Sequence, residues 1–206
     1  MKNKGILDIL LLPEKFYKNF TDSKTSLYIG IFAVGIIDLI FAVSDKYQKI
    51  FFNRTQPDLL KNIFISLMFV IVIGLADILF FSYPIFDLLK KFKKTEEDKH
   101  NKNSVIKLMK IQITANIVGF IPNILLTILS MKTDVENNVD LASALFLVFI
   151  LLQVWFCAII SKGIKSIYNF EQKFRTLVLP VVFLWTFATS IAINFIIDKV
   201  LMYILK

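Results

Sequence analysis

Residue types that usually mark a catalytic or metal site are scarce in this sequence. The 206 residues contain one Cys and one His, and the phosphate-binding loop, the His-Glu-x-x-His pair and the Gly-x-Ser-x-Gly elbow are all missing. A single thiol excludes an intramolecular disulfide, and a lone His cannot form a metal site with a second one. We therefore expect no catalytic residues, no cofactor and no metal ligands, and we expect that the protein is not an enzyme.

Glycine and proline are also rare, at 6 and 5 residues, whereas hydrophobic residues make up 56% of the chain. Five apolar runs have about the 20 residues that a helix needs to cross the hydrocarbon core of a bilayer. They extend over residues 26–44, 62–83, 111–131, 141–161 and 177–197. The sequence thus predicts an all-α, polytopic membrane protein whose five transmembrane helices form one bundle.

Acidic residues are outnumbered, with 16 Asp and Glu against 24 Lys and Arg. Five spans place successive loops on alternate sides of the membrane, so that 17 basic residues fall on the side of the N-terminus and 7 on the other. Because basic loops remain in the cytoplasm, we expect a multi-pass cell-membrane protein with a cytoplasmic N-terminus and an outer C-terminus. Topology accounts for the positive charge, and we expect no nucleic-acid partner.

Residues 1–25 differ from the five-span domain of residues 26–206, because they are too short and too charged to cross a bilayer. Apolar residues recur among them at helical spacing, with lysines in between, and Pro13 suits the first turn of a helix. This pattern predicts a short amphipathic helix on the inner membrane surface, with its lysines among anionic headgroups. The lipid bilayer is therefore one expected partner.

Two of the spans carry the same motif, Gly-x-x-Asp followed by two aliphatic residues and Phe. Asp38 follows Gly35 by three residues, and Asp77 follows Gly74 in the same way. At 1.5 Å per residue the two acids differ in depth by about 10 Å, which argues against the near contact of an aspartyl-protease dyad. A buried carboxylate costs several kcal/mol unless it is paired, hydrated or protonated. Three interpretations stay open: neutral hydrogen-bonded anchors, a proton or cation relay, and an ion pair between Asp77 and a snorkelling lysine.

The third span has polar residues along one helical face, at steps of four or three residues. A weaker series in the fifth span ends at Asn194. Such a face is not left to lipid, so we expect it to meet other helices or a water-filled cavity. The candidate site residues are Asp38, Asp77, Gln112, Asn116, Asn123, Thr127 and Asn194.

Several features recur together along nearly the whole chain. They are the surface segment with Pro13 and Phe16, the five spans, and the pair Val154-Trp155 followed by Gly163 and a short polar loop before the last span. In these features the chain resembles the Yip-one (Ypt/Rab-interacting protein) family. The abundance of Lys, Ile and Asn over Arg indicates a bacterial-type member.

The resemblance implies a non-enzymatic integral membrane protein that acts as a membrane-organising or protein-interaction scaffold. Its partner would be a membrane protein, a cytoplasmic protein or a second copy of the chain. The alternative is a small transporter or channel subunit, with a proton or cation path through the intramembrane Asp and Asn residues.

Overall fold

The computed structural model describes residues 10–44, 51–52, 55–91, 103–132 and 138–204. Five helices are long and apolar enough to cross a membrane: α3 (Lys24–Val43), α5 (Gln56–Lys90), α7 (Asn103–Lys132), α8 (Val139–Ile167) and α10 (Val178–Ile204). Two short helices, α2 (Glu14–Lys18) and α9 (Gln172–Arg175), complete the described part, which contains no strand element. The predicted all-α fold with five apolar helices and a short preceding helix is confirmed.

Three of the helices, α5, α7 and α8, extend beyond both ends of the apolar runs that predicted them. The clearest case is α5, whose 35 residues begin well before residue 62 and end well after residue 83. Polar turns at both ends remain helical; at the start, Thr55 Oγ1 donates to Asp58 Oδ2 at 2.6 Å. Hydropathy marks the segment that lies in hydrocarbon, and it does not mark where helical hydrogen bonding stops.

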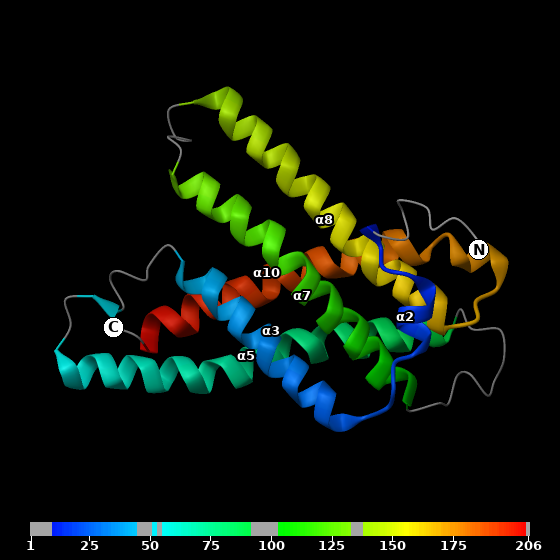
Figure 1. Ribbon diagram of the computed structural model, residues 1–206, viewed down its shortest axis with the longest axis horizontal. Helices are drawn as coiled ribbons and strands as arrows, with labels where there is room; N and C mark the ends of the chain where they lie inside the picture. Colours follow the sequence, from blue (N-terminus) through cyan, green and yellow to red (C-terminus); the bar gives the residue numbers. More distant parts are fainter. Residues whose placement is uncertain (1–9, 45–50, 53–54, 92–102, 133–137, 205–206) are drawn as a thin grey trace.

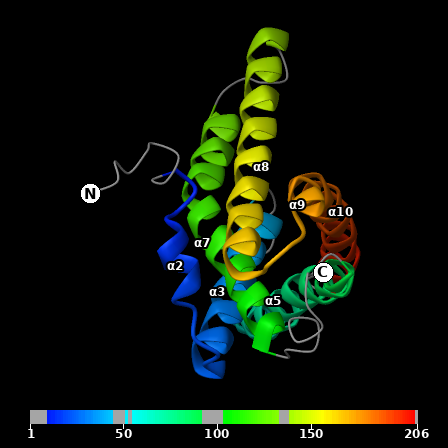
Figure 2. The same ribbon diagram turned by 90° about the vertical axis from the view of Figure 1, so that its right-hand side faces the viewer.

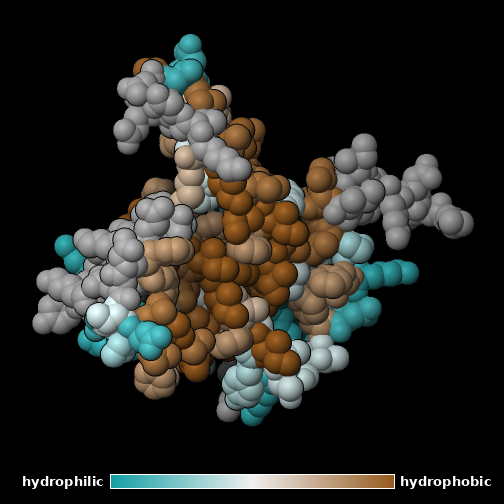
Figure 3. All heavy atoms as spheres, turned by 60° about the vertical axis from the view of Figure 1, so that its left-hand side comes forward, coloured by the Kyte–Doolittle hydropathy of each residue, from teal (hydrophilic) through white to brown (hydrophobic). Residues whose placement is uncertain are grey.

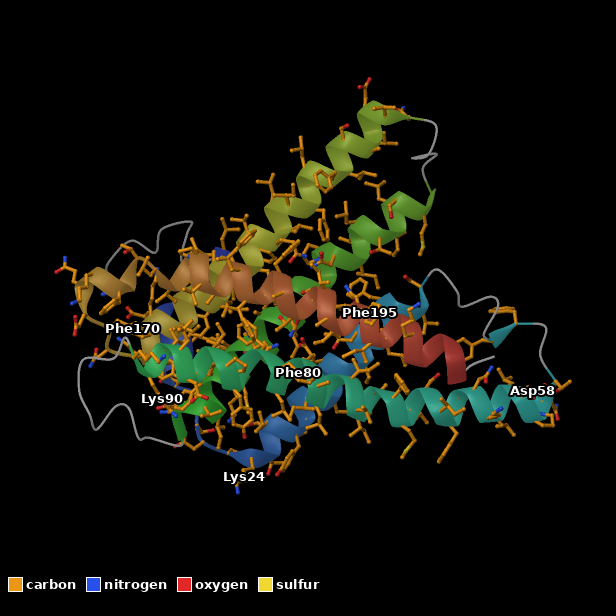
Figure 4. The ribbon with its side chains drawn as sticks, turned by 180° about the vertical axis from the view of Figure 1, so that it is seen from behind. Lys24, Asp58, Phe80, Lys90, Phe170 and Phe195 are labelled. Carbon is orange, nitrogen blue, oxygen red and sulfur yellow. The ribbon has the colours of Figure 1, made fainter. Side chains whose placement is uncertain are left out.

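The helices form a splayed bundle with two distinct ends (Figure 1). Helices α2 and α9 and the end of α5 lie at one end, whereas the start of α5 and the end of α10 lie at the other. Lys90 and Asp58, at the two ends of α5, show this separation in Figure 4. Figure 3 shows hydrophobic side chains covering the middle of the molecule, with hydrophilic ones gathered toward its edges. This surface suits a bilayer around the middle of the bundle.

The segment before α3 is docked onto α8. The side chain of Tyr17 in α2 is completely buried, and its hydroxyl donates to the carbonyl oxygens of Leu11 at 3.0 Å and Ile159 at 3.2 Å. Trp155 Nε1 of α8 donates to the carbonyl oxygen of Leu10 at 2.9 Å. The polar atoms of both aromatic side chains therefore fix the segment to the bundle.

Gly163 of α8 makes this docking possible. A Cβ at this position would lie 2.8 Å from Cε1 of Tyr17 and 2.7 Å from Cγ2 of Ile111. Any larger residue would force one of these side chains to move, because real Cβ contacts are not that short. Gly163 thus allows the α2 tyrosine to pack against α8 and α7 at the same point.

Helices α3 and α5 cross with their backbones in contact at Gly35 and Gly74. A Cβ on Gly35 would overlap the carbonyl oxygen of Val70, and one on Gly74 would overlap that of Ile31. Small residues of this kind let membrane helices approach closely. The repeated Gly-x-x-Asp motif therefore brings the two helices together, and each acid follows the contact by three residues.

Candidate functional site

A cavity of about 120 Å³ lies among all five long helices. Asp38 of α3 and Asp77 of α5 both line it. The other lining residues are Phe81, Gln112, Asn116, Phe156, Thr186, Thr189, Ser190, Ile193 and Asn194. Most of these side chains are polar, and none of them is basic. The cavity is therefore a polar, acidic site inside an apolar bundle.

Neutral donors from α7 hold the Asp77 carboxyl group. Gln112 Nε2 donates to Asp77 Oδ2 at 3.1 Å and to its backbone oxygen at 3.3 Å, and Asn116 Nδ2 donates to the same Oδ2 at 3.3 Å. Gln112 is itself oriented by Ser82, whose hydroxyl donates to Oε1 at 3.1 Å. Among the described residues, no lysine forms an ion pair with Asp77. Two donors on one oxygen are the partners that suit an ionised carboxylate.

Asp38 has the opposite environment. Its Oδ2 is buried, and no hydrogen-bond donor among the described residues reaches it. The two carboxyl groups lie close enough to interact electrostatically. A buried carboxylate oxygen without a partner is costly, so this atom needs a proton, a water molecule or a cation.

The depth argument placed the two acids at different levels of the bundle, and the structure adds that both side chains line the same site. Both line one cavity, because α3 crosses α5 at Gly35 and Gly74 rather than running alongside it (Figure 1). Each acid comes only three residues after the glycine at the crossing, so both carboxyl groups remain near the point where the two helices cross. The depth estimate assumed that the spans lie parallel to one another, whereas α3 and α5 cross at an angle (Figure 1).

The polar stripe of the third span divides into two parts. Gln112 and Asn116 line the cavity, whereas Asn123 and Thr127 do not. Asn123 Nδ2 donates to the carbonyl oxygen of Gly119 at 2.8 Å, and Thr127 Oγ1 donates to that of Asn123 at 3.0 Å. The later half of the stripe, Asn123 and Thr127, thus forms its hydrogen bonds within α7 itself, as is common for short polar side chains in helices.

The fifth span supplies one whole side of the cavity. Asn194 was among the candidate residues, at the end of a series in steps of four that begins at Thr186 and includes Ser190. Thr189 lies outside this series, because it comes three residues after Thr186, and it was therefore missed. Phe81 and Phe156 also line the cavity. Nothing in the sequence distinguished them from the other apolar residues of the spans. Ser190 and Asn194 are exposed, so the cavity is open along α10.

The size of the cavity limits what it can hold. About 120 Å³ is enough for several water molecules or a small ion, and it is far below the roughly 300 Å³ at which sites for organic ligands begin. In the described part of the chain, no three His, Cys, Asp or Glu side chains gather as they would around a metal ion. The lack of cofactor and metal sites in the whole chain stays a prediction.

Fold and cavity together define a polytopic helical membrane protein with a small acidic site in its interior. Comparisons of the chain with models of protein families, with characterised proteins and with solved structures found no match.

Proposed function

We propose that this chain is a small transporter or channel subunit that binds a proton or a monovalent cation between Asp38 and Asp77. The observation that carries the proposal is the buried, unpartnered Oδ2 of Asp38, on a cavity that also contains Asp77. Two acids that face only neutral groups leave negative charge uncompensated inside the membrane. A bound proton or cation compensates it.

The two carboxyl groups have different tasks in this proposal. Asp77 is held by Gln112 and Asn116 and supplies a fixed negative charge. Asp38 has a free oxygen atom and receives the ion. Amide and hydroxyl oxygens of Asn116, Thr189 and neighbouring lining residues replace part of the water shell of a cation.

The open side along α10 gives the ion a route into the cavity. Ser190 and Asn194 form the exposed edge, and Asp77 with Gln112 forms the inner end. If the N-terminus is cytoplasmic, the Asn194 edge lies in the outer half of the membrane and the Gln112 end in the inner half. An ion that enters at Asn194 thus reaches Asp77 through the same cavity.

Flux in proteoliposomes tests the proposal. Purified protein is reconstituted around a pH-sensitive dye, and parallel vesicles report Na⁺ and K⁺ movement. We expect flux of one of these ions with the wild type and its loss with Asp38→Asn. Asp140→Asn is the matched control, because Asp140 is an exposed acid in the first turn of α8. No flux of any of the three ions, or equal flux with Asp38→Asn, contradicts the proposal.

A second function, that of a membrane-organising scaffold, is supported by the docked surface segment and by the resemblance to the Yip-one family. The segment is fixed to α8 by Tyr17 and Trp155. It presents Lys15, Phe16 and Lys18 on its exposed side, which is the composition of a surface that binds an anionic membrane.

The two functions depend on different residues, so mutations can distinguish them. A scaffold that shapes membranes changes the diameter of proteoliposomes, and this effect disappears when Lys15 and Lys18 become Gln and Phe16 becomes Ser. Asp38→Asn leaves the diameter unchanged on this account. If only Asp38→Asn alters the vesicles, the scaffold function is contradicted.

A further inference from the structure

A second cavity, of about 400 Å³, lies where the end of α8 meets α2 and the segment from α9 to α10. Figure 2 shows the end of α8 between α2 and α9. The lining residues are Leu11, Glu14, Ala158, Ser161, Lys162, Lys165, Ser166, Arg175 and Leu179. None of these residues lines the acidic cavity. The two cavities are therefore separate sites of opposite charge.

Positive charge dominates this cavity. Lys165 and Arg175 come from different helices and lie close enough to repel each other electrostatically. No carboxylate of the described residues forms an ion pair with either of them. Among the described residues of the lining, Glu14 is the one acid, and its Oε1 is paired with Lys18 Nζ at 3.3 Å. Within the described part of the chain, no ion pair therefore offsets the repulsion between Lys165 and Arg175.

Ser161 adds a second, independent sign of a missing ligand. Its side chain is 3% exposed, it lines the cavity, and its Oγ has no hydrogen-bond partner among the described residues. Buried hydroxyl groups are nearly always hydrogen-bonded. An acceptor that sits in the cavity between Ser161, Lys165 and Arg175 satisfies all three groups at once.

The rest of the lining is apolar. Leu11, Ala158 and Leu179 lie in the same cavity as the cations. The cavity also lies at the end of a helix that is apolar enough to cross the membrane. A ligand that fills it has an anionic head and a hydrocarbon tail. Basic pockets between membrane helices bind the headgroups of anionic lipids for this reason.

We propose that this cavity binds the phosphate group of an anionic phospholipid. The phosphate accepts hydrogen bonds from Ser161, Lys165 and Arg175, and the first part of an acyl chain lies against Leu11 and Leu179. Arg175 suits this role, because its planar guanidinium can donate to two phosphate oxygens. The bound lipid joins the docked N-terminal segment to the last span.

Binding is measured on the full-length protein in detergent, with phosphatidylglycerol and phosphatidylcholine of equal chain length. We expect phosphatidylglycerol to bind more tightly. The double variant Lys165→Gln with Arg175→Gln weakens it by about thirtyfold, as expected for the loss of two basic residues near an anionic headgroup. The matched control is Lys24→Gln with Lys173→Gln, which removes two exposed lysines that do not line the cavity.

Ser161→Ala keeps the test informative if the double variant does not fold. It removes an unpartnered hydroxyl, so the unfolding temperature without lipid stays the same, whereas phosphatidylglycerol binds several-fold more weakly. Equal binding of the two lipids, or unchanged binding by both Ser161→Ala and the double variant, overturns the proposal. So does full competition by inorganic phosphate at the same concentration, which would show a site for free anions.

Discussion

Gly35 and Gly74 lie in direct backbone contact where α3 crosses α5, with Gly74 placed so that an added Cβ would be 2.9 Å from Gly35 N. Each glycine is followed three residues later by an acid that lines the interior cavity. The contact therefore determines how close the two carboxyl groups can come. Replacing either glycine should disturb both the packing of the bundle and the geometry of the acidic site.

Gly35→Ala should lower the stability of the folded protein by about 1–3 kcal/mol or more, since overpacking forces backbone shifts of this cost. Thermal unfolding in detergent measures the loss. Gly119→Ala is the matched control, because its Cβ would meet the movable ring of Phe156 at 3.3 Å rather than a backbone carbonyl. If both variants lose the same stability, the two helices do not touch at Gly35.

Gln112→Leu should lower the free energy of unfolding by about 2–4 kcal/mol. The change removes donors from Asp77 and the acceptor of Ser82, and it leaves buried polar groups without partners. Asn123→Leu on the same helix is the control, because Asn123 donates only to its own helix. Denaturation of the two variants side by side gives the difference. A cost for Asn123→Leu that equals or exceeds that of Gln112→Leu would contradict the hydrogen-bond network.

The sequence predicted the helical spans and much of the acidic cavity, for physical reasons that are easy to name. Hydrophobic length determines how many helices can cross a bilayer, and a polar residue within such a helix must face the interior. Asp38, Asp77, Gln112, Asn116 and Asn194 therefore met in one place. Crossing angles are set by the packing of side chains from distant segments, so the meeting of the two acids could not be derived from depth alone.

The docking of the N-terminal segment onto α8 also could not be predicted from the sequence. An amphipathic pattern predicts an apolar face, but it does not say whether lipid or another helix covers that face. Tyr17 turned out to be buried against α8, in the space left by Gly163. The two residues are far apart in the sequence, and no pattern in it indicated that they would be in contact.

High pH should destabilise the protein through its buried tyrosines. Burial raises the pKa of Tyr17 and Tyr168 above the ordinary value of 10.0, so both stay protonated in the folded state. The unfolded chain loses these protons above pH 10, and the free energy of unfolding then falls by up to about 1.4 kcal/mol per pH unit for each tyrosine. Below pH 10 this contribution is fully present.

Tyr17→Phe should remove the contribution of one tyrosine from this slope, which is up to about 1.4 kcal/mol per pH unit. At neutral pH the same variant loses about 1–2 kcal/mol of stability, because the hydroxyl donates to the buried carbonyl oxygen of Ile159 and to the partly buried one of Leu11. Unfolding curves between pH 8 and pH 11 measure both effects. Identical slopes for the variant and the wild type would show that Tyr17 is ionised as easily in the folded state as in the unfolded state.

The two acids should respond differently to removal of their charge. Asp38→Asn removes a buried carboxylate oxygen that has no partner, so stability should stay the same or rise by about 1 kcal/mol. Asp77→Asn should cost about 1.5–3 kcal/mol, since Gln112 and Asn116 donate to its charged oxygen. The unfolding temperatures of the two variants give the comparison. A larger loss for Asp38→Asn than for Asp77→Asn would mean that Asp38 is the structural acid.

Cation flux through Asp38→Asn proteoliposomes tests the central claim most directly, because that variant is expected to fold at least as well as the wild type. Flux is measured with an imposed membrane potential for H⁺, Na⁺ and K⁺ in turn, alongside Asp140→Asn. We predict that the wild type and Asp140→Asn conduct the same ion and that Asp38→Asn does not. Undiminished flux through folded Asp38→Asn protein would contradict the assignment of the acidic cavity as the ion site.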